Sequence, residues 1–533
     1  MIFNPLEEYN TKFKALHLDN INAFFDELVS KSGVDIEANR KTVKEHIELT
    51  ENLSKLKKKR NWLLFLRVVM IITLVLIPLV ILKTTPKIKA LKEEIEQANK
   101  RAEELLEEAN NQMLPLNALF TSNDATALVE KTVPEFDFKP LFTIEQEKDM
   151  RVNYDFAGGG GRNYSTLDVL AGHYNENPFL FENRLVHRMG SETYHGYKTI
   201  HWTETYRDSN GKLRTRSRSQ TLKASVTKPK PFYSTEVVLY YCAQAAPELC
   251  FSRDASHLDR KSEKALERHV KKEEKRLRKK TDKAISKNES FMSMSNTEFE
   301  VLFDALDRNN EVQFRTLFTP LAQTNLEKLI LSKDGYGDDF IFIKEKRTNE
   351  IISTHSQNRG LTVSSRSYVS YSFDEIKNNF ISKNVEYFKA VYFDFAPLLA
   401  IPAYQDRPVH SLKPIPDSSQ LYSLRESEAL ANLVPSYEVV HPKTKTKAIL
   451  KSEYAGAASD SDEMTITAYS YDIKQRVDIV SVYGGDGRYH DVSVQWDDYI
   501  PLEASNSFLV TAADKVKEQR VSARRNGLCM INY

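Results

Sequence analysis

The stretch RNWLLFLRVVMIITLVLIPLVILKTTP, Arg60–Pro86, is the longest apolar run of this chain and decides the predicted fold. Within it, the 21 residues Trp62–Leu82 include only three that are not apolar, Arg67, Thr73 and Pro78. As one α-helix this run would extend for about 31 Å, at ~1.5 Å per residue, which is close to the hydrocarbon thickness of a bilayer. The sequence therefore predicts a single transmembrane helix.

The residues around this run fit the same prediction. Trp62 is an aromatic residue at one end, and Arg67 lies near enough to that end for its side chain to reach the headgroups. More cations precede the run than follow it, which predicts a single-pass protein of the cell membrane with a cytoplasmic N-terminus. The cations predicted to lie at the membrane interface are Lys57, Lys58, Lys59 and Arg60.

Composition sets further bounds on the class of protein. The 533 residues include 75 Lys and Arg against 74 Asp and Glu, so no global charge attracts the chain to nucleic acid. An apolar content of 41% favours folded domains over disorder. The three cysteines, Cys242, Cys250 and Cys529, form neither a disulfide framework nor a metal-binding CxxC pair, so we expect buried free thiols.

The predicted fold class is α+β. An N-terminal helical hairpin leads into the transmembrane helix, which continues as a juxtamembrane helix and is followed by two or three mixed α+β domains with a long basic helix inserted. In order, the segments are a helical, polar region (1–59), the transmembrane helix (60–83), an amphipathic juxtamembrane helix or stalk (84–114), a β-rich α+β domain (115–252), the basic helix (253–290), an α+β domain (291–410) and a β-rich C-terminal region (411–533).

Residues 88–109 carry apolar side chains at alternating spacings of three and four. This pattern predicts a coiled-coil stalk, and through it a homo-oligomer. An amphipathic helix that packs on the chain's own N-terminal hairpin or soluble domain explains the pattern equally well. The residues of the pattern are Ile88, Leu91, Ile95, Ala98, Ala102, Leu105 and Ala109.

The clearest hairpin of the chain is HWTETYRDSNGKLRTRSRSQ, His201–Gln220. Asn210-Gly211 favours a two-residue type I′ turn, which fixes the pairing of the two strands. In that pairing four arginines share one face, while Trp202 and Tyr206 lie on the opposite, core-facing side. The arginines, which we predict to contact an anion or a lipid headgroup, are Arg207, Arg214, Arg216 and Arg218.

Several other elements are predicted from local patterns. A long basic helix covers residues 253–287. Residues 309–333 are expected to form a strand, a turn at Thr319-Pro320 and a helix, and the apolar run 386–403 to form buried strands. Hairpins are predicted over residues 338–354 and 477–496, the second turning at glycines.

Two short stretches contain ligand-binding residue types without the required spacing. Gly158–Gly161 is followed by neither the Lys-Ser/Thr of a phosphate-binding loop nor a dinucleotide-binding pattern, so a simple loop is expected. Asp460, Asp462 and Glu463 are not followed by a calcium-binding loop, and we interpret them as a solvated acidic turn.

Histidines are also frequent in one part of the chain, where a carboxylate precedes one of them by three residues. Zinc sites use such side chains, but same-face neighbours on a strand are two residues apart, so surface or half-buried positions explain the pattern better. We predict no catalytic residue, no metal site and no cofactor. The residues in question are His173, His187, His195 and His201, with Glu192.

The segment EFEVLFDALDRNNEVQFRTLFTPLAQTNLEKLI, Glu298–Ile330, taken with the order of elements, resembles a group of uncharacterised bacterial single-pass membrane proteins with a mixed α+β soluble region. The motif FRTLFTPL carries most of this resemblance. The resemblance implies a bacterial membrane protein and no particular activity.

These observations favour a non-enzymatic membrane protein that presents its α+β region for contact with a protein or a surface. A second interpretation is a ligand-binding sensor or an enzyme with its site between the two α+β domains. A third is that the basic faces bind anionic lipid or nucleic acid. Nucleic acid is the least favoured partner, because the net charge is only +1.

Overall fold

The computed structural model shows a mixed α+β fold with antiparallel sheets, which confirms the predicted class. The chain forms two compact units. Unit 1 comprises Met1–Leu6, Glu135–Leu361 and Phe393–Tyr533, and unit 2 comprises Glu7–Pro134 and Thr362–Tyr392. The structure describes all residues except 73–76, 158–160, 288–290, 358, 409–412, 416–419, 421, 459–460 and 512–533.

The apolar run Trp62–Leu82 does not form one continuous helix in the part of the chain that the structure describes. Helix α3 (Ile36–Ile72) ends within it and helix α4 (Ile77–Asn117) begins within it, while residues 73–76 lie outside the described residues. The part on α3 is about 17 Å long at ~1.5 Å per residue, roughly half a bilayer core.

None of the helices in the described ranges is long and apolar enough to cross a membrane. The predicted transmembrane helix over 60–83 and the cell-membrane location are therefore wrong, and the cytoplasmic N-terminus inferred from them loses its basis. The sequence pattern misled because a count of apolar residues does not distinguish one spanning helix from a run shared by two helices, here α3 and α4.

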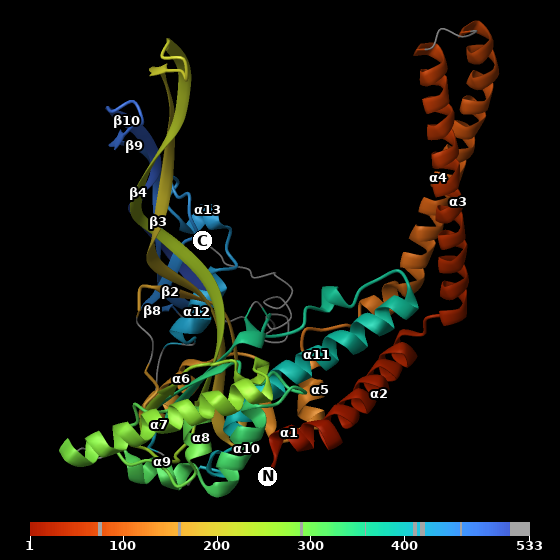
Figure 1. Ribbon diagram of the computed structural model, residues 1–533. Helices are drawn as coiled ribbons and strands as arrows, with labels where there is room; N and C mark the ends of the chain where they lie inside the picture. Colours follow the sequence, from red (N-terminus) through yellow and green to blue (C-terminus); the bar gives the residue numbers. More distant parts are fainter. Residues whose placement is uncertain are drawn as a thin grey trace. The chain divides into compact units, whose positions relative to one another are not determined.

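In unit 2, α3 and α4 lie side by side (Figure 1). Leu53 of α3 forms a buried cluster with Ile95 and Ala102 of α4. Most of the apolar pattern over 88–109 is buried, but within the chain rather than between copies. The coiled-coil prediction is thus corrected in favour of the intramolecular packing that explained the pattern equally well, because α3 covers the seam.

Local signals explain where the helices of unit 2 begin and end. Helix α2 (Lys14–Ser32) stops at Gly33, whose φ of 63° is left-handed. Asp35 then accepts a hydrogen bond from the Ala38 main-chain N–H at 3.0 Å and caps α3. The unit is completed by α5 (Asp124–Thr132) and by the first part of α11 (Phe373–Leu399).

Unit 1 is built on a seven-stranded antiparallel sheet in the order β1-β2-β3-β4-β7-β6-β5 and a three-stranded sheet in the order β10-β9-β8. The first sheet comprises β1 (Phe136–Lys139), β2 (Tyr164–Tyr174), β3 (Asn177–Arg207), β4 (Leu213–Cys242), β5 (Cys250–Arg253), β6 (Phe340–Glu345) and β7 (Thr348–Ser353). The second comprises β8 (Ile449–Ala458), β9 (Ser461–Tyr483) and β10 (Tyr489–Thr511).

Helices accompany these sheets. They are α6 (Ile144–Tyr154), α7 (Glu263–Lys287), α8 (Thr297–Phe303), α9 (Glu311–Leu317), α10 (Pro320–Ile330), α12 (Leu424–Ala431) and α13 (Ser436–Val439), while the short α1 (Pro5–Glu8) lies at the boundary of the two units. The basic helix predicted over 253–287 is shorter in the structure, because α7 begins at Glu263 and Arg253 belongs to β5. The hairpins predicted over 338–354 and 477–496 are confirmed as β6–β7 and β9–β10.

Two predicted strands are helices instead. Residues 386–403, expected as buried strands, belong largely to α11, because an apolar run with few polar residues has no period that separates a buried helix from a buried strand. The segment before Thr319 forms α9, whose first turn is capped by Asn310, with the Gln313 N–H at 3.0 Å from its side-chain oxygen.

The core of unit 1 contains a cluster of aromatic side chains. Phe395, from the last part of α11, is fully buried, and its ring lies 4.8–6.2 Å from five others. Most of these contacts are edge-to-face, the geometry that aromatic rings prefer. The partners are Phe136, Tyr174, Phe179, Phe181 and Tyr241.

Strands β3 and β4 continue as a long hairpin, and the β9–β10 hairpin packs against one of its faces (Figure 1). Buried Ile200 and Leu222 meet buried Val492 and Val494 in this contact. Gly196 is required for it, since a Cβ atom there would overlap the Ser493 carbonyl oxygen. The outer end of the β3–β4 hairpin, residues 203–218, is called the tip below.

Candidate functional site

The loop at the tip is wider than a type I′ turn. The Asp208 N–H donates to the Lys212 carbonyl oxygen at 3.0 Å. The N–H of Gly211, whose φ is 76°, donates to the Asp208 carbonyl oxygen at 2.9 Å. The Asp208 carboxylate also accepts from the N–H groups of Asn210 and Lys212, each at 3.0 Å, and from Arg214 at 2.8 Å. These hydrogen bonds stabilise a five-residue loop, and the main-chain donors, with Lys212 first, hold the pKa of Asp208 below its usual value.

This loop shifts the strand pairing by one residue from the predicted register. Arg207 pairs with Leu213, and Tyr206 with Arg214. A one-residue shift moves the side chains of one strand to the opposite face. Arg214, Arg216 and Arg218 therefore lie on the face of Trp202 and Tyr206, and Arg207 lies on the other face, contrary to the prediction.

Carboxylates and an aromatic ring order the arginines on this face. Glu204 accepts from Arg216 and Arg218, each with its Nε at 2.9 Å. The Arg216 guanidinium also lies over the Tyr206 ring, 5.1 Å from its centroid. The hydrogen bonds from Arg218 and Arg216 lower the pKa of Glu204, so this carboxylate stays ionised beside them.

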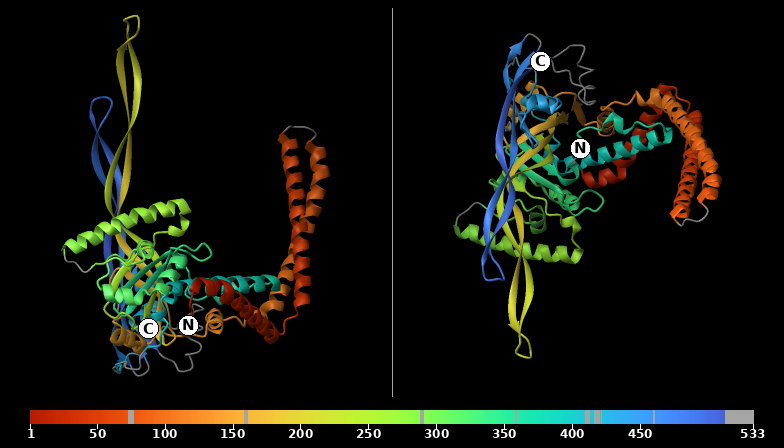
Figure 2. Two further views of the ribbon diagram at one scale, coloured as in Figure 1. Left: turned by 60° about the horizontal axis from the view of Figure 1, so that its bottom comes forward. Right: turned by 90° about the horizontal axis from the view of Figure 1, so that it is seen from above.

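The tip projects beyond the hairpin that covers the rest of this face. The Gly485 N–H, in the β9–β10 turn, donates to the Gln220 side chain at 2.7 Å, and in both views of Figure 2 the β3–β4 hairpin (yellow) extends past the β9–β10 hairpin (blue). Most side chains of the tip are exposed on both faces. Its five cations, Arg207, Lys212, Arg214, Arg216 and Arg218, exceed its two carboxylates, Glu204 and Asp208, by three charges.

The residues predicted to lie at a membrane interface are all on α3, in unit 2. Trp62 is exposed and Arg67 is half-buried. The Arg60 guanidinium donates to the Asn61 side chain at 2.9 Å. Exposed side chains on the same helix are Lys57, Lys58 and Lys59. Because no described helix spans a membrane, their predicted role is withdrawn.

The histidines singled out by sequence do not converge. No cluster of His, Cys, Asp and Glu suited to a metal ion occurs within the described ranges. Glu192 instead pairs with Lys230 at 2.6 Å. His173 and His187 are half-buried, whereas His195 and His201 are exposed.

The remaining sequence candidates lie partly outside the described residues. This holds for Gly158–Gly160, Asp460 and Cys529. Asp462 is buried in β9 and accepts a hydrogen bond from the Tyr422 N–H at 3.0 Å, so it is not part of a solvated acidic turn. Cys242 is a buried free thiol, and burial raises its pKa.

A buried cluster around His355 was not predicted. Its Nδ1 lies 2.7 Å from Asp339 and its Nε2 lies 3.3 Å from Asp394, while the Tyr336 ring stacks on the imidazole at 3.8 Å. Arg359 also contacts Asp394, at 2.7 Å. Burial opposes a charge on the ring, but the hydrogen bonds to Asp339 and Asp394 outweigh it and raise the pKa of His355 to about 9.

The pKa of His355 makes stability depend on pH. A histidine whose pKa is higher in the folded chain stabilises the fold fully at pH values below its pKa in the unfolded chain, near 6.5. This contribution to stability is lost as the pH rises through the folded-state pKa of about 9. We expect H355Q to cost about 3 kcal/mol of unfolding free energy near pH 6 and much less near pH 10. Urea denaturation of both proteins at the two pH values checks this, and an equal loss at both would contradict it.

A second buried cluster joins α12 to the sheet. Ser423 caps α12 by accepting from the Glu426 N–H at 3.0 Å, which fixes the position of Arg425. Arg425 contacts Glu147 of α6 at 3.1 Å and Glu182 of β3 at 3.3 Å. All three side chains of this triad are almost fully buried. Its surroundings are protein, so we assign it a structural role.

Comparison with known proteins identifies no relative. No protein-family model matches the chain, and no curated protein or solved structure matches it either. The resemblance of Glu298–Ile330 to bacterial membrane proteins, and the bacterial origin that it implied, therefore have no support. The functional argument rests on the tip and on the chain's own chemistry.

Proposed function

We propose that this chain is a non-enzymatic binding protein whose tip contacts double-stranded nucleic acid. The observation that carries the proposal is a protruding two-stranded ribbon, exposed on both faces, with three more cations than carboxylates. The sequence alone favoured a protein or a surface as partner. The shape of the ribbon changes that preference, because the major groove of B-DNA, about 12 Å wide, admits a two-stranded β-ribbon.

The spacing of the arginines suits a phosphate backbone. Arg214, Arg216 and Arg218 alternate along β4 and share one face, so their Cα atoms are about 6.8 Å apart along the strand. Double-stranded DNA carries one phosphate charge per ~1.7 Å of its axis, so a row of three arginines can contact several phosphates. The opposite face carries hydroxyl groups that donate to phosphates or bases, from Thr203, Thr205, Thr215 and Ser217.

The ion pairs of the tip do not block this contact. The side chains of Arg216 and Arg218 are 45–46% exposed, as is that of their shared partner Glu204 at 44%. Exposed ion pairs contribute only about 0–1 kcal/mol, so a phosphate can displace the carboxylate. In the free protein Glu204 holds both guanidiniums on one face, so these side chains lose less conformational entropy when a phosphate binds.

The test compares the affinity of wild type and of R214Q/R216Q/R218Q for a fluorescent DNA duplex of ~20 base pairs. We expect saturable binding and at least a tenfold loss in the variant at ~0.1 M salt, measured by fluorescence anisotropy. Absence of binding, or a variant as tight as wild type, would refute the proposal. So would competition by an acidic polypeptide such as polyglutamate that is as strong as competition by unlabelled duplex.

A matched variant controls for total charge. It also removes three positive charges, but from exposed positions of unit 1 that lie outside the tip and belong to no ion pair among the described residues. The control is K443Q/K447Q/K474Q. Its affinity for the duplex should stay within about twofold of wild type, since exposed charges far from a contact are screened by salt.

A further inference from the structure

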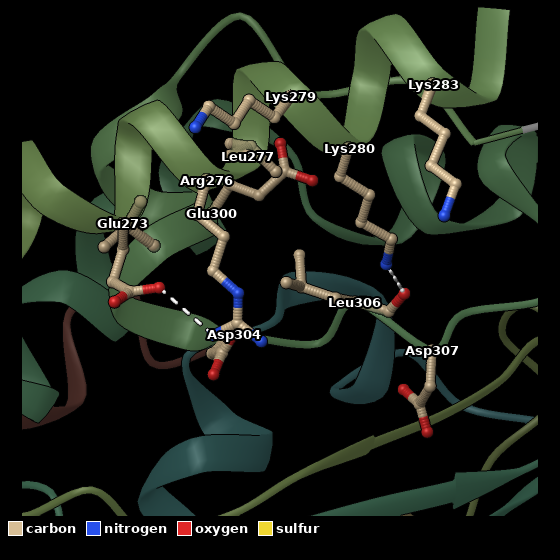
Figure 3. Close-up of a pocket in the computed structure, with 11 residues that line it drawn as sticks. Glu273, Arg276, Leu277, Lys279, Lys280, Lys283, Glu300, Asp304, Leu306 and Asp307 are labelled. Atoms are coloured by element: carbon tan, nitrogen blue, oxygen red, sulfur yellow. Dashed lines mark hydrogen bonds and ion pairs between the residues drawn. The ribbon is translucent and has the colours of Figure 1, made fainter. Parts of the chain in front are cut away.

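A pocket of about 530 Å³ opens in unit 1 between α7 and the segment that contains α8 and the loop after it (Figure 3). Its size is within the range of small-molecule sites. Leu277, Val301 and Leu306 provide apolar lining. The rest of the lining consists of charged residues, and the two ends of the pocket differ in net charge.

Most of the acidic groups in the pocket are already engaged. Glu273 accepts from Arg276 at 3.3 Å, and Figure 3 shows Asp304 next to the same arginine. The Arg276 charge favours ionised Asp304, although desolvation outweighs it and raises the pKa of that carboxyl. Glu300 is buried and accepts from Arg308 at 2.5 Å. This end of the pocket therefore carries little net charge.

The other end carries two ammonium groups. Figure 3 shows Lys280 and Lys283 of α7 with their side chains pointing in the same direction toward Leu306 and Asp307. Neither lysine forms an ion pair with a carboxylate among the residues that the structure describes. Asp307, another acidic residue of the lining, already accepts from the Ser252 main-chain N–H at 2.9 Å and from its hydroxyl at 2.5 Å.

Lys280 is fixed in place without being neutralised. Its ammonium donates to the Leu306 carbonyl oxygen at 2.5 Å and lies 4.2 Å from the centre of the Phe291 ring. Burial, followed by the charge of Arg308, lowers the pKa of Lys280 and outweighs the carboxylates of Glu300, Asp304 and Asp307, which favour its charged form. An anionic group placed here would stabilise the ammonium form.

We propose that this pocket binds a small molecule that carries a phosphate group, with the phosphate between Lys280 and Lys283. A phosphate has several acceptor oxygens and close to two negative charges near neutral pH, which matches two neighbouring ammonium groups. The organic part of the ligand would cover Leu277, Val301 and Leu306. The proposal is independent of the tip, since none of the tip residues lines the pocket.

The test uses the full chain and isothermal titration calorimetry with adenosine 5′-monophosphate, inorganic phosphate and adenosine. We expect saturable binding of the monophosphate, weaker binding of inorganic phosphate and at least tenfold weaker binding of adenosine. A K280Q/K283Q variant should bind the monophosphate at least tenfold more weakly than wild type. Equal binding of adenosine, absence of saturable binding by both phosphates, or an unchanged variant would overturn the proposal.

Two further variants separate binding from folding. K283E changes an exposed side chain, so it reverses the charge without disturbing the contacts of Lys280, and it should abolish phosphate binding with an unchanged melting temperature. The matched control is K271Q/K275Q, two exposed lysines of α7 outside the pocket. A control that loses binding as strongly as K280Q/K283Q would show general attraction to the helix and would also overturn the site.

Discussion

The R425Q variant is expected to lose about 3–5 kcal/mol of unfolding free energy. Arg425 contacts Glu147 and Glu182, whose side chains are 1% and 0% exposed. Glutamine would leave buried Glu182 without a cation and buried Glu147 with only the exposed Arg151, at 2.6 Å, and removal of one partner from a buried ion pair has a large cost. Thr166 alone, which donates to Glu182 at 2.5 Å, does not replace the lost charge.

Urea denaturation at neutral pH, followed by far-UV circular dichroism, measures this loss. The matched control is R476Q, which removes one guanidinium from an exposed pair with Asp498. The control should change the unfolding free energy by less than about 1 kcal/mol. If R425Q were as stable as R476Q, the triad would contribute nothing to the docking of α12.

The F395A variant is expected to cost about 3–5 kcal/mol through a different mechanism. Phe395 is fully buried, and its ring is in contact range of five other aromatic rings. Removal of the ring loses its transfer free energy and leaves a cavity that the surrounding strands cannot fill by small movements. This cluster holds α11 to the sheet of unit 1, so the midpoint of unfolding should fall strongly.

The same denaturation measurement tests F395A. Phe232, which is 47% exposed on β4, provides the control, and F232A should cost about 1 kcal/mol or less. Similar losses for F395A and F232A would mean that the aromatic cluster is not the packing centre of unit 1.

Sequence patterns were most successful where the signal is local. The β9–β10 hairpin was predicted from strand-like residues on both sides of Gly484–Gly487. The register at the tip was missed by one residue, because the Asp208 carboxylate competes for main-chain N–H groups and widens the loop. That single shift changes which side chains share a face with the arginines.

Features that depend on long-range contacts were not predicted. Residues 386–403 form a helix because of how they pack, which an apolar run does not reveal. Arg425 and Glu182 are 243 positions apart, and no spacing rule relates them. The same holds for His355, whose carboxylate partners come from two other segments. In the candidate site, the arginines themselves were predicted, but their projection beyond the β9–β10 hairpin was not.

The salt dependence of duplex binding tests the proposed function most directly. Each phosphate that a cation neutralises contributes about 0.9 to the slope of the logarithm of the association constant against the logarithm of salt concentration. We predict that R214Q/R216Q/R218Q binds with a slope shallower by about two to three than that of wild type, while K443Q/K447Q/K474Q keeps the wild-type slope. Identical slopes for wild type and R214Q/R216Q/R218Q would contradict the assignment of the tip as a nucleic-acid contact.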